Sequence, residues 1–333
     1  MNTKPKVVVI GGGTGSFVAL TGLKKYPVDL SAIVTMSDSG GSNKRIRDEF
    51  GLLPTSDIRQ CLVALSDENG NTGLLRQLFM YRFSKGEGIS GMTFGNLFMA
   101  ALSDIVGSQE EAIRQTGKVL RIRGTVIPVS FTKTNLFAEY TDGKILTEEY
   151  LIDEPPLGSV TSRIKKVYLK PKTKVNPQAI EAIKKADYIV IGPGDLYTSI
   201  IPNLLVGGIT KALSETKAKK VYALNLMTKY GQTTDYKASD HIATLEKYTY
   251  KNIVDAVLVN TQKPSKEALK WYRDFEEYPV VDNLGNIKST KIIRAPLLKN
   301  AIIEKDSSDS LKRSIIRHDP EKLASAIMEL LNK

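Results

Sequence analysis

The 333-residue chain contains only one cysteine and two histidines. A single thiol cannot form an internal disulfide, and so few soft ligands cannot assemble a cysteine–histidine metal centre. Any metal that the chain binds is therefore expected to be a hard cation held by oxygen atoms. The cysteine, Cys61, lies in an apolar helical stretch, and we interpret it as a buried structural thiol and not as a nucleophile.

Long hydrophobic runs are also absent from the sequence. The apolar run near the N-terminus, Val7 to Ile10, is far shorter than the core of a secretion signal, and no stretch approaches the length of a membrane span. We therefore expect a cytoplasmic protein without membrane insertion.

The formal charge is +11, from 47 basic and 36 acidic residues. Such a charge fits an anionic ligand or a solvated lysine surface, and the scattering of the lysines along the chain favours the surface. The sequence has no basic–aromatic sheet signature, zinc finger or recognition helix, so we predict no nucleic-acid partner.

Hydrophobic periodicity predicts alternating strands and helices, which is typical of a doubly wound, mostly parallel α/β sheet. Residues 140–176 differ, because their short extended runs indicate a β-rich insertion or lid. We expect a single domain, 1–333. The predicted strands are 6–10, 30–36, 126–130, 135–140, 187–191, 219–225, 254–259 and 291–294, and the predicted helices are 16–25, 57–65, 73–81, 93–105, 109–118, 177–185, 202–214, 239–247 and 320–332.

A glycine-rich loop follows the first predicted strand. Without side chains, its backbone can approach a ligand closely, and the N–H groups of the next helix would point at bound oxygens. The spacing matches neither the dinucleotide fingerprint nor the P-loop, so the loop predicts phosphate binding without naming the nucleotide. The candidate ligand-binding residues are Gly11, Gly12, Gly13, Thr14 and Gly15.

The second predicted strand ends in Ser37-Asp38-Ser39-Gly40-Gly41. In a doubly wound sheet this strand end lies beside the first loop, so Asp38 could reach a ribose hydroxyl or a Mg²⁺ ion on a phosphate, and Gly40 and Gly41 would extend the cradle. Basic residues follow, and they fit either diphosphate neutralisation or an exposed helix face. They are Lys44, Arg45 and Arg47.

Three further polar residues leave alternatives open. Asp57 either caps a helix or contacts the ligand. Asn96, in a Gly-Asn pair that begins a helix, has an amide that could read the polar edge of a ligand. His241 follows a helix-start pattern, which favours a residue next to a cap over a catalytic base.

A second buried strand, Tyr188 to Ile191, also runs into a glycine loop. Ligands of open α/β sheets bind where the winding direction reverses, and two such loops are the natural walls of that crevice. Asn225, at a later strand end, adds an amide to the same rim. The candidate residues of the second loop are Gly192, Gly194, Asp195, Thr198 and Ser199.

Several motifs together resemble those of the bacterial gluconeogenesis factor family, within the phospholactate-transferase-like superfamily. The resemblance covers nearly the whole chain and implies a Rossmann-like fold. It also implies a cytoplasmic protein that binds a nucleotide-type ligand, with UDP-sugars expected, and that supports cell shape and wall synthesis during gluconeogenic growth. The motifs are GGGTGS at 11–16, SDSGGS at 37–42, DIRQCLVALS at 57–66, FGN at 94–96, ADYIVIGPGDLYTSIIPNLLV at 186–206 and NLMTKYGQTTDY at 225–236.

One departure from the family pattern affects the expected chemistry. Related sequences commonly carry two aspartates before the double glycine, whereas this chain has Ser37-Asp38. Enzymes of the superfamily transfer a phospholactyl-type group from an activated guanosine diphosphate adduct to a deazaflavin, and the acidic pair is a plausible Mg²⁺ site. A single carboxylate therefore favours a regulator that binds a UDP-sugar over the alternative, a Mg-dependent transferase of such a group from a nucleoside-diphosphate-activated donor.

Other hypotheses have less support from the sequence. An NAD-dependent oxidoreductase would explain the first loop but not the second. Arg317 stands just before the last predicted helix, where it is either a surface residue or a contact at the ligand mouth. A homodimer and a protein partner from cell-wall synthesis or carbon metabolism both stay open.

Overall fold

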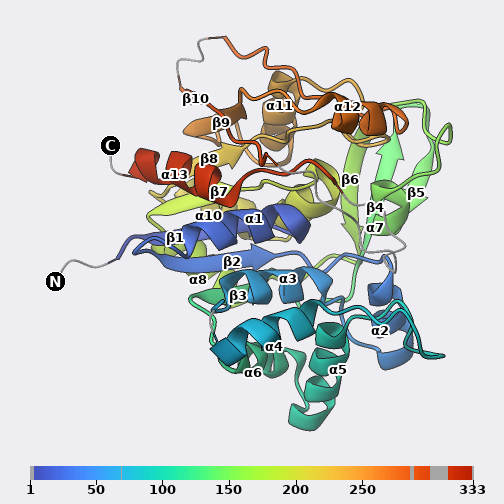
Figure 1. The fold of residues 1–333 in the computed structure, drawn as a ribbon. Helices are drawn as coiled ribbons and strands as arrows, with labels where there is room; N and C mark the ends of the chain where they lie inside the picture. The colour runs from blue at the N-terminus through green and yellow to red at the C-terminus, as the bar shows by residue number, and fades with distance from the viewer. Residues whose placement is uncertain (1–3, 69, 286–288, 301–313, 332–333) are drawn as a thin grey trace.

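The computed structural model describes residues 4–68, 70–285, 289–300 and 314–331 (Figure 1). Its main feature is a seven-stranded sheet in the order β10-β9-β8-β7-β1-β2-β3, with every neighbouring pair parallel. This confirms the α/β prediction. The strands are β1 (Lys6–Gly11), β2 (Asp29–Val34), β3 (Thr125–Pro128), β7 (Tyr188–Ile191), β8 (Lys219–Ala223), β9 (Ala256–Asn260) and β10 (Lys291–Ala295).

The winding direction of this sheet reverses between β1 and β7. From β1 the chain continues outward to β2 and β3, and from β7 it continues to β8, β9 and β10 on the other side. Both glycine loops follow the two central strands of this reversal. Ligands of open α/β sheets bind beyond the carboxyl ends of the strands at such a point.

Helices cover both faces of the sheet because alternate residues of its buried strands point to opposite sides. Val7 and Val9 of β1 pack with α1, α3 and α13, whereas Val8 and Ile10 pack with α8, α9 and α10. The helices described are α1 (Gly13–Leu23), α2 (Ser42–Phe50), α3 (Ser56–Leu65), α4 (Gly70–Met80), α5 (Phe94–Val106), α6 (Gln109–Val119), α7 (Glu149–Asp153), α8 (Pro177–Lys185), α9 (Ile201–Leu204), α10 (Ile209–Glu215), α11 (Ala238–Tyr248), α12 (Lys266–Arg273) and α13 (Pro320–Leu331), with a π-helical turn η1 (Leu196–Ile200).

Helix α13 packs closely on α1. A β-carbon added at Gly22 would lie 1.9 Å from the carbonyl oxygen of Pro320. Only a glycine at this position lets the two backbones approach so closely. The start of α13 is therefore fixed against the last turns of α1.

A second, antiparallel sheet forms the predicted insertion. Its strands β4 (Asn135–Tyr140), β5 (Ile145–Thr147) and β6 (Ile164–Lys170) lie in the order β5-β4-β6. The hydroxyl of Tyr140 donates to the carbonyl of Gly231, 3.0 Å away, and the inner face of this sheet packs in the same core as Val8 and Ile10.

Several predicted boundaries were wrong. The strand at 135–140 belongs to the insertion and not to the parallel sheet, as its alternation of buried and partly exposed residues fits an antiparallel sheet with one face covered. Helices α2 and α12 were missed, and α7 lies where an extended run was expected. The helix expected at 202–214 is divided, because Gly208 adopts a φ of +101°.

Capping and burial follow the sequence more closely. The Asn176 side chain accepts a hydrogen bond from Gln178 N at 3.0 Å ahead of Pro177, as the Asn-Pro pair predicts. Cys61 is fully buried, which confirms the structural interpretation, and burial raises the pKa of its thiol.

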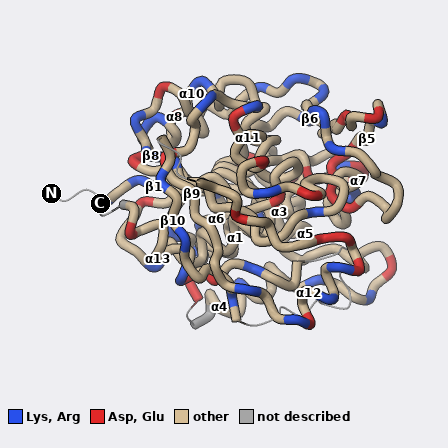
Figure 2. The backbone as a smooth tube through the Cα atoms, turned by 90° about the horizontal axis from the view of Figure 1, so that it is seen from above, with Lys and Arg blue, Asp and Glu red and all other residues tan. Residues whose placement is uncertain are grey.

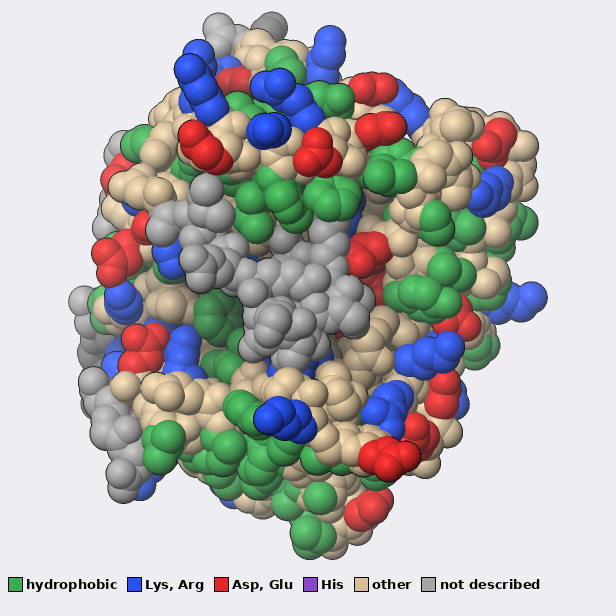
Figure 3. All heavy atoms as spheres, turned by 45° about the vertical axis from the view of Figure 1, so that its right-hand side comes forward, with side chains coloured by type: hydrophobic (Ala, Val, Ile, Leu, Met, Phe, Trp, Pro, Cys, Tyr) green, Lys and Arg blue, Asp and Glu red, His purple; other side chains and the backbone are tan. Residues whose placement is uncertain are grey.

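Charge and hydrophobicity add two observations about the surface. Basic and acidic residues are mixed over the fold and on the face that carries the small sheet (Figures 2 and 3). Within the described ranges, no helix is long and apolar enough to cross a membrane.

Candidate functional site

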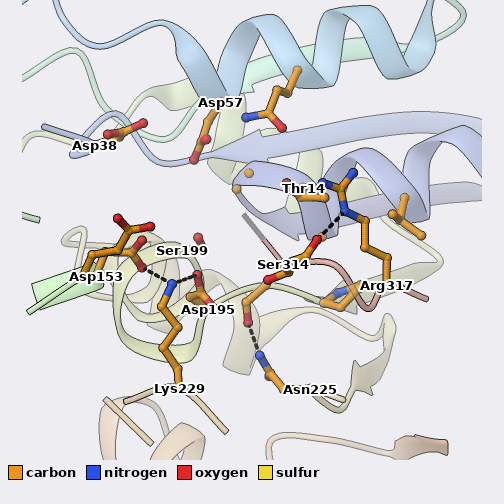
Figure 4. A pocket seen from close by; sticks show the side chains of 18 of the residues that line it. Thr14, Asp38, Asp57, Asp153, Asp195, Ser199, Asn225, Lys229, Ser314 and Arg317 are labelled. Carbon is orange, nitrogen blue, oxygen red and sulfur yellow. Dashed lines mark hydrogen bonds and ion pairs between the residues drawn. The ribbon is translucent and has the colours of Figure 1, made fainter. Parts of the chain in front are cut away.

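A cavity of about 300 Å³ lies beyond the carboxyl ends of the central strands. Residues of both glycine loops line it, together with residues that follow β2 and β8 and residues from the insertion and the C-terminal segment (Figure 4). The predicted site residues that line it are Gly12, Gly13, Thr14, Gly15, Asp38, Gly40, Gly194, Asp195, Ser199, Asn225 and Arg317.

The two glycine loops pack against each other through their backbones. A β-carbon added at Gly15 would lie 2.0 Å from the carbonyl oxygen of Pro193, and one added at Gly194 would lie 3.5 Å from the carbonyl oxygen of Gly12. Helix α1 begins at Gly13, so the first backbone N–H groups of α1 lie at the cavity wall. This is the arrangement that binds anions at helix N-termini.

Asp57 lies against the first loop from the first turn of α3. A β-carbon added at Gly12 would lie 2.3 Å from Asp57 Oδ2, and the N-cap of α3 is Thr55. The carboxylate therefore faces the glycine loop and the cavity. The sequence left capping and ligand contact open for Asp57, and its place in the cavity lining is compatible with ligand contact.

Asp38 both braces its own turn and faces the cavity. Its Oδ1 accepts a hydrogen bond from Gly40 N at 2.9 Å, and its Oδ2 accepts one from Asn43 Nδ2 at 2.5 Å. Because its carboxylate lines the cavity, it is placed to meet a ligand group or a cation.

The insertion supplies carboxylates that the sequence interpretation missed. Glu149 and Asp153 of α7 line the cavity, and Lys229 Nζ lies 3.1 Å from Asp153 Oδ1 and 3.3 Å from Asp195 Oδ2 (Figure 4). Lys229 stands within the NLMTKYGQTTDY motif, so the signal was present, but its two partners come from distant segments. Thr198 Oγ1 donates to Asp153 Oδ1 at 3.0 Å and so supports the same cluster.

The titration behaviour of this region follows from burial and crowding. Burial, and then the negative charges of Asp38 and Asp153, raise the pKa of Glu149 well above its usual range. Burial also raises the pKa of Asp195, to about 6, against the opposing charge of Lys229. Burial alone would lower the pKa of Lys229. The negative charges of Asp153 and Asp195 outweigh burial and hold this pKa well above its usual value.

Asn225 holds the second glycine loop in place. Its Nδ2 donates to the carbonyl of Gly194 at 2.7 Å, and its Oδ1 accepts from the Tyr222 hydroxyl at 3.1 Å. That hydroxyl lies 3.1 Å from Nδ1 of His241, which is fully buried within α11. Burial lowers the pKa of His241 to about 4, so this imidazole is part of the support of the loop.

Arg317 reaches the cavity from the C-terminal segment. Its Nε donates to the carbonyl of Ser314 at 3.2 Å, and it lines the same cavity as Thr14 (Figure 4). Leu298 pairs with His318 in a short antiparallel bridge, which fixes the segment next to Arg317.

The other predicted residues do not line the cavity. Asn96 is fully buried, and it accepts from Arg59 Nε at 3.1 Å and donates to the hydroxyls of Ser42 and Ser56, each at 3.0 Å. Asn96 thus links the first turns of α2, α3 and α5 by hydrogen bonds, and it does not face the cavity as the sequence interpretation expected. Arg47 binds Asp48, Asn135 and Glu148 away from the cavity. Also outside the lining are Gly11, Gly41, Lys44, Arg45, Gly192 and Thr198.

The described part of the chain does not form a magnesium site from protein side chains alone. Among the residues with described positions, no group of three or more histidine, cysteine, aspartate or glutamate residues could hold a metal ion. Mg²⁺ commonly uses one or two carboxylates together with ligand phosphates, and Asp38 could supply one such ligand beside the first loop.

Comparison with known proteins identifies the family of this chain. The family model for the 2-phospho-L-lactate transferase CofD matches residues 7–298. The chain belongs to the CofD family.

Full-length relatives of this CofD-family chain carry the name Gluconeogenesis factor. The Bacillus subtilis protein is 39% identical over 334 residues, covering 100% of both chains. The Halalkalibacterium halodurans protein is 41% identical over 327 residues, covering 98% of this chain and 96% of its own. The resemblance stated from the sequence motifs is therefore confirmed.

A solved structure extends the likeness to three dimensions. The crystal structure of a Bacillus halodurans protein described as a member of the UPF0052 family is 39% identical and has a TM-score of 0.87. It covers 98% of this chain and 100% of that chain. The CofD-family assignment thus applies to the parallel sheet together with its antiparallel insertion.

Proposed function

We propose that this chain binds a nucleotide sugar of the UDP-sugar type in the cavity and acts as a cytoplasmic regulatory protein. Two glycine loops that pack backbone to backbone at the reversal of the sheet carry the proposal, because they form an anion-binding wall without the dinucleotide spacing. The name of the relatives, Gluconeogenesis factor, supports a role in gluconeogenic growth. We propose that this role serves cell shape and wall synthesis. A protein partner from cell-wall synthesis or carbon metabolism would receive the signal.

The diphosphate is assigned to the end of the cavity where Thr14 and Arg317 lie. The N-terminus of α1 offers backbone N–H groups there, and the guanidinium adds a charge-assisted hydrogen bond. Ser199 and Thr228 add neutral polar groups to the lining, which suit hydroxyl-rich or nucleoside parts of a ligand.

Two observations, on His241 and on the acidic pair of the superfamily, favour a regulatory role over catalysis. His241 lies outside the cavity lining, beneath Tyr222, and cannot reach a ligand there. The acidic pair of the superfamily is reduced to Asp38. Catalysis would then need a cation that Asp38 and the phosphates of the ligand hold together.

The alternative is a Mg-dependent transferase of a phospholactyl-type group from a nucleoside-diphosphate-activated donor. The family model and the two aspartates beside the first loop, Asp38 and Asp57, favour this second candidate. Release of free nucleotide from such a donor in the presence of Mg²⁺ and an acceptor would establish it.

Isothermal calorimetry tests the binding proposal. The purified chain is titrated with UDP-N-acetylglucosamine, UDP-glucose, GDP and NAD, each with and without Mg²⁺. We expect saturable binding of the UDP-sugars and much weaker binding of NAD. Preference for NAD, or no binding of any UDP-sugar under either condition, would overturn the proposal.

A further inference from the structure

We infer that His318 recognises the nucleobase of the ligand, with Nε2 of its neutral imidazole accepting a hydrogen bond from N3–H of uracil. The inference rests on the proposed function and deepens it, because it assigns the base to one wall of the cavity. We call this the apolar wall, and it is formed by His318, Leu226, Met227, Tyr272 and Ile316. His318 is not one of the site residues predicted from the sequence.

His318 brings a polar atom without a hydrogen bond to the cavity wall. The residue lines the cavity and is only 5% exposed. None of the residues that the structure describes makes a hydrogen bond with its Nε2. A buried polar atom without a partner lowers the stability of a fold, so such an atom needs an explanation. At a cavity wall, a ligand that supplies the missing hydrogen bond provides one.

The backbone on both sides of His318 is fixed. The carbonyl of Arg317 accepts a hydrogen bond from Lys299 N at 3.0 Å, and Asp319 N donates to the carbonyl of Leu297 at 2.8 Å. The imidazole is therefore held at the cavity wall before a ligand arrives, which lowers the entropy cost of binding.

The second ring nitrogen determines which tautomer is present. Burial lowers the pKa of His318 to about 4, and a hydrogen bond to the backbone of Leu224 opposes this shift. A backbone group that favours the protonated ring is an acceptor, and the N–H of Leu224 already donates to the carbonyl of Leu258 at 3.1 Å. The acceptor is therefore the Leu224 carbonyl. Since Nε2 makes no bond within the described chain, Nδ1 carries the proton at neutral pH and Nε2 is an acceptor.

Apolar side chains make up the rest of this wall. Tyr272 and Ile316 are buried in one hydrophobic cluster, and Leu226 and Met227 pack against it. Leu298, which forms a backbone bridge with His318, belongs to the same cluster. The acceptor thus stands in apolar surroundings.

Such a wall suits a nucleobase better than a hexose. Uracil attached to ribose has two apolar faces and one ring N–H, at N3, so a single acceptor satisfies its donor. A hexose carries hydroxyl groups around its ring, and each one buried without a partner would weaken binding. Aromatic and thioether side chains such as those of Tyr272 and Met227 also pack well on flat rings.

UDP-glucose and its N3-methyl derivative test the hydrogen bond directly, because the derivative lacks only the donor. We expect calorimetry at pH 7.5 to show the derivative binding at least tenfold more weakly, since a site built around an acceptor rejects a ligand without the donor. Equal affinities would overturn the inference and leave the proposed function intact. Failure of UDP-glucose to bind, with or without Mg²⁺, would overturn the proposed function itself.

Two variants assign the effect to His318. His318→Phe keeps a ring but removes the acceptor, so it should weaken UDP-glucose binding at least tenfold and leave the affinity for the N3-methyl derivative within threefold of wild type. His318→Gln, whose side-chain oxygen can take the place of Nε2, should keep at least a threefold preference for UDP-glucose. A folded His318→Phe protein with the wild-type preference would contradict the inference, because a clash of the methyl group would then explain the preference.

Nitrogen-15 NMR of histidine-labelled wild type decides the question even if the variants do not fold. The chain has two histidines, and His241, outside the cavity lining, is the internal control. Saturating UDP-glucose should shift the Nε2 signal of His318 as a new hydrogen bond does and leave His241 unchanged, and the N3-methyl derivative should not cause this shift. A proton on Nε2 of His318 in the free protein, or an Nε2 signal that UDP-glucose does not move, would overturn the inference.

Discussion

The space that a side chain at Gly12 would occupy is taken by Asp57 of α3. Asp57 approaches the loop so tightly that a β-carbon at Gly12 would lie 2.3 Å from its carboxylate. A ligand phosphate at the start of α1 must therefore share this space with a carboxylate, either through a cation or by binding toward Thr14. We therefore expect ligand affinity to depend strongly on the charge of the side chains at the first loop.

A charge added at Gly13 tests the first loop directly. Gly13 has a φ of +58°, which aspartate and asparagine tolerate better than most residues, and an added β-carbon would lie 3.8 Å from Asp57 Oδ1. We expect Gly13→Asp to abolish UDP-sugar binding in calorimetry because a second carboxylate meets the phosphates. Gly13→Asn, with almost the same shape and the same strain, should keep measurable binding. Equal affinities of the two variants would show that the loop does not contact the phosphates.

Arg317 is the cation assigned to the diphosphate. Arg317→Glu should weaken UDP-sugar binding by more than tenfold, a change of about 1.4 kcal/mol or more, since an attractive contact becomes a repulsive one. Arg273→Glu, at an exposed position of α12, is the matched control and should bind as wild type does. Wild-type affinity in Arg317→Glu would remove this residue from the site.

Buried His241 makes stability depend on pH. Burial lowers the pKa of His241 from 6.5 to about 4, so between these values the unfolded chain binds more protons than the folded one. Stability from the neutral imidazole is thus complete above pH 6.5 and is lost as the pH falls toward 4. Relative to His241→Gln, the wild type should lose about 2 kcal/mol in denaturant unfolding between pH 7 and pH 5. A pH-independent difference between the two proteins would refute this explanation.

Residue roles were predictable only where the signal is local. The glycines of the first loop show their backbone freedom directly in the sequence. The role of Asn96 is not visible in the sequence, because an amide at a helix start looks the same whether it faces a ligand or the hydroxyls of Ser42 and Ser56. Lys229 was missed for the same reason, since its meaning depends on Asp153 and Asp195.

At the scale of elements, the contact between the two glycine loops holds the segments that follow β1 and β7 against each other. Gly15→Ala would place a β-carbon 2.0 Å from the Pro193 carbonyl, which only a shift of backbone could relieve. We expect a loss of at least about 2 kcal/mol in denaturant unfolding, together with weaker ligand binding. Gly207→Ala, where an added β-carbon meets open space, should change stability by less than about 0.5 kcal/mol. A Gly15→Ala protein as stable as the control would show that the loops separate easily.

The elements of the parallel sheet were largely predictable, because each buried strand is a short apolar run bounded by glycine or polar residues. Those of the insertion were not. Residues 135–140 alternate in a way that fits either a sheet edge or a separate antiparallel sheet, and only the pairing with β6 decides between them. Helix α7 is a five-residue element whose apolar residues also fit an extended strand.

At the scale of the whole molecule, the insertion and the parallel sheet share one core. Tyr140 bonds Gly231, and Asp153 meets Lys229 across the boundary between them. We therefore predict that residues 1–333 unfold as a single domain, with one calorimetric transition whose van't Hoff and calorimetric enthalpies agree. Two resolved transitions would show that the insertion is an independent unit.

Helix α1 also sets a distance within the molecule. Its start forms the first loop, and its far end, at Gly22, holds Pro320 three residues after Arg317. The helix from Gly13 to Gly22 makes a rigid spacer of about 14 Å between these two points. Fusion partners or trimmed C-termini that loosen the first turn of α13 would therefore change ligand affinity in an assay, although they touch nothing in the cavity.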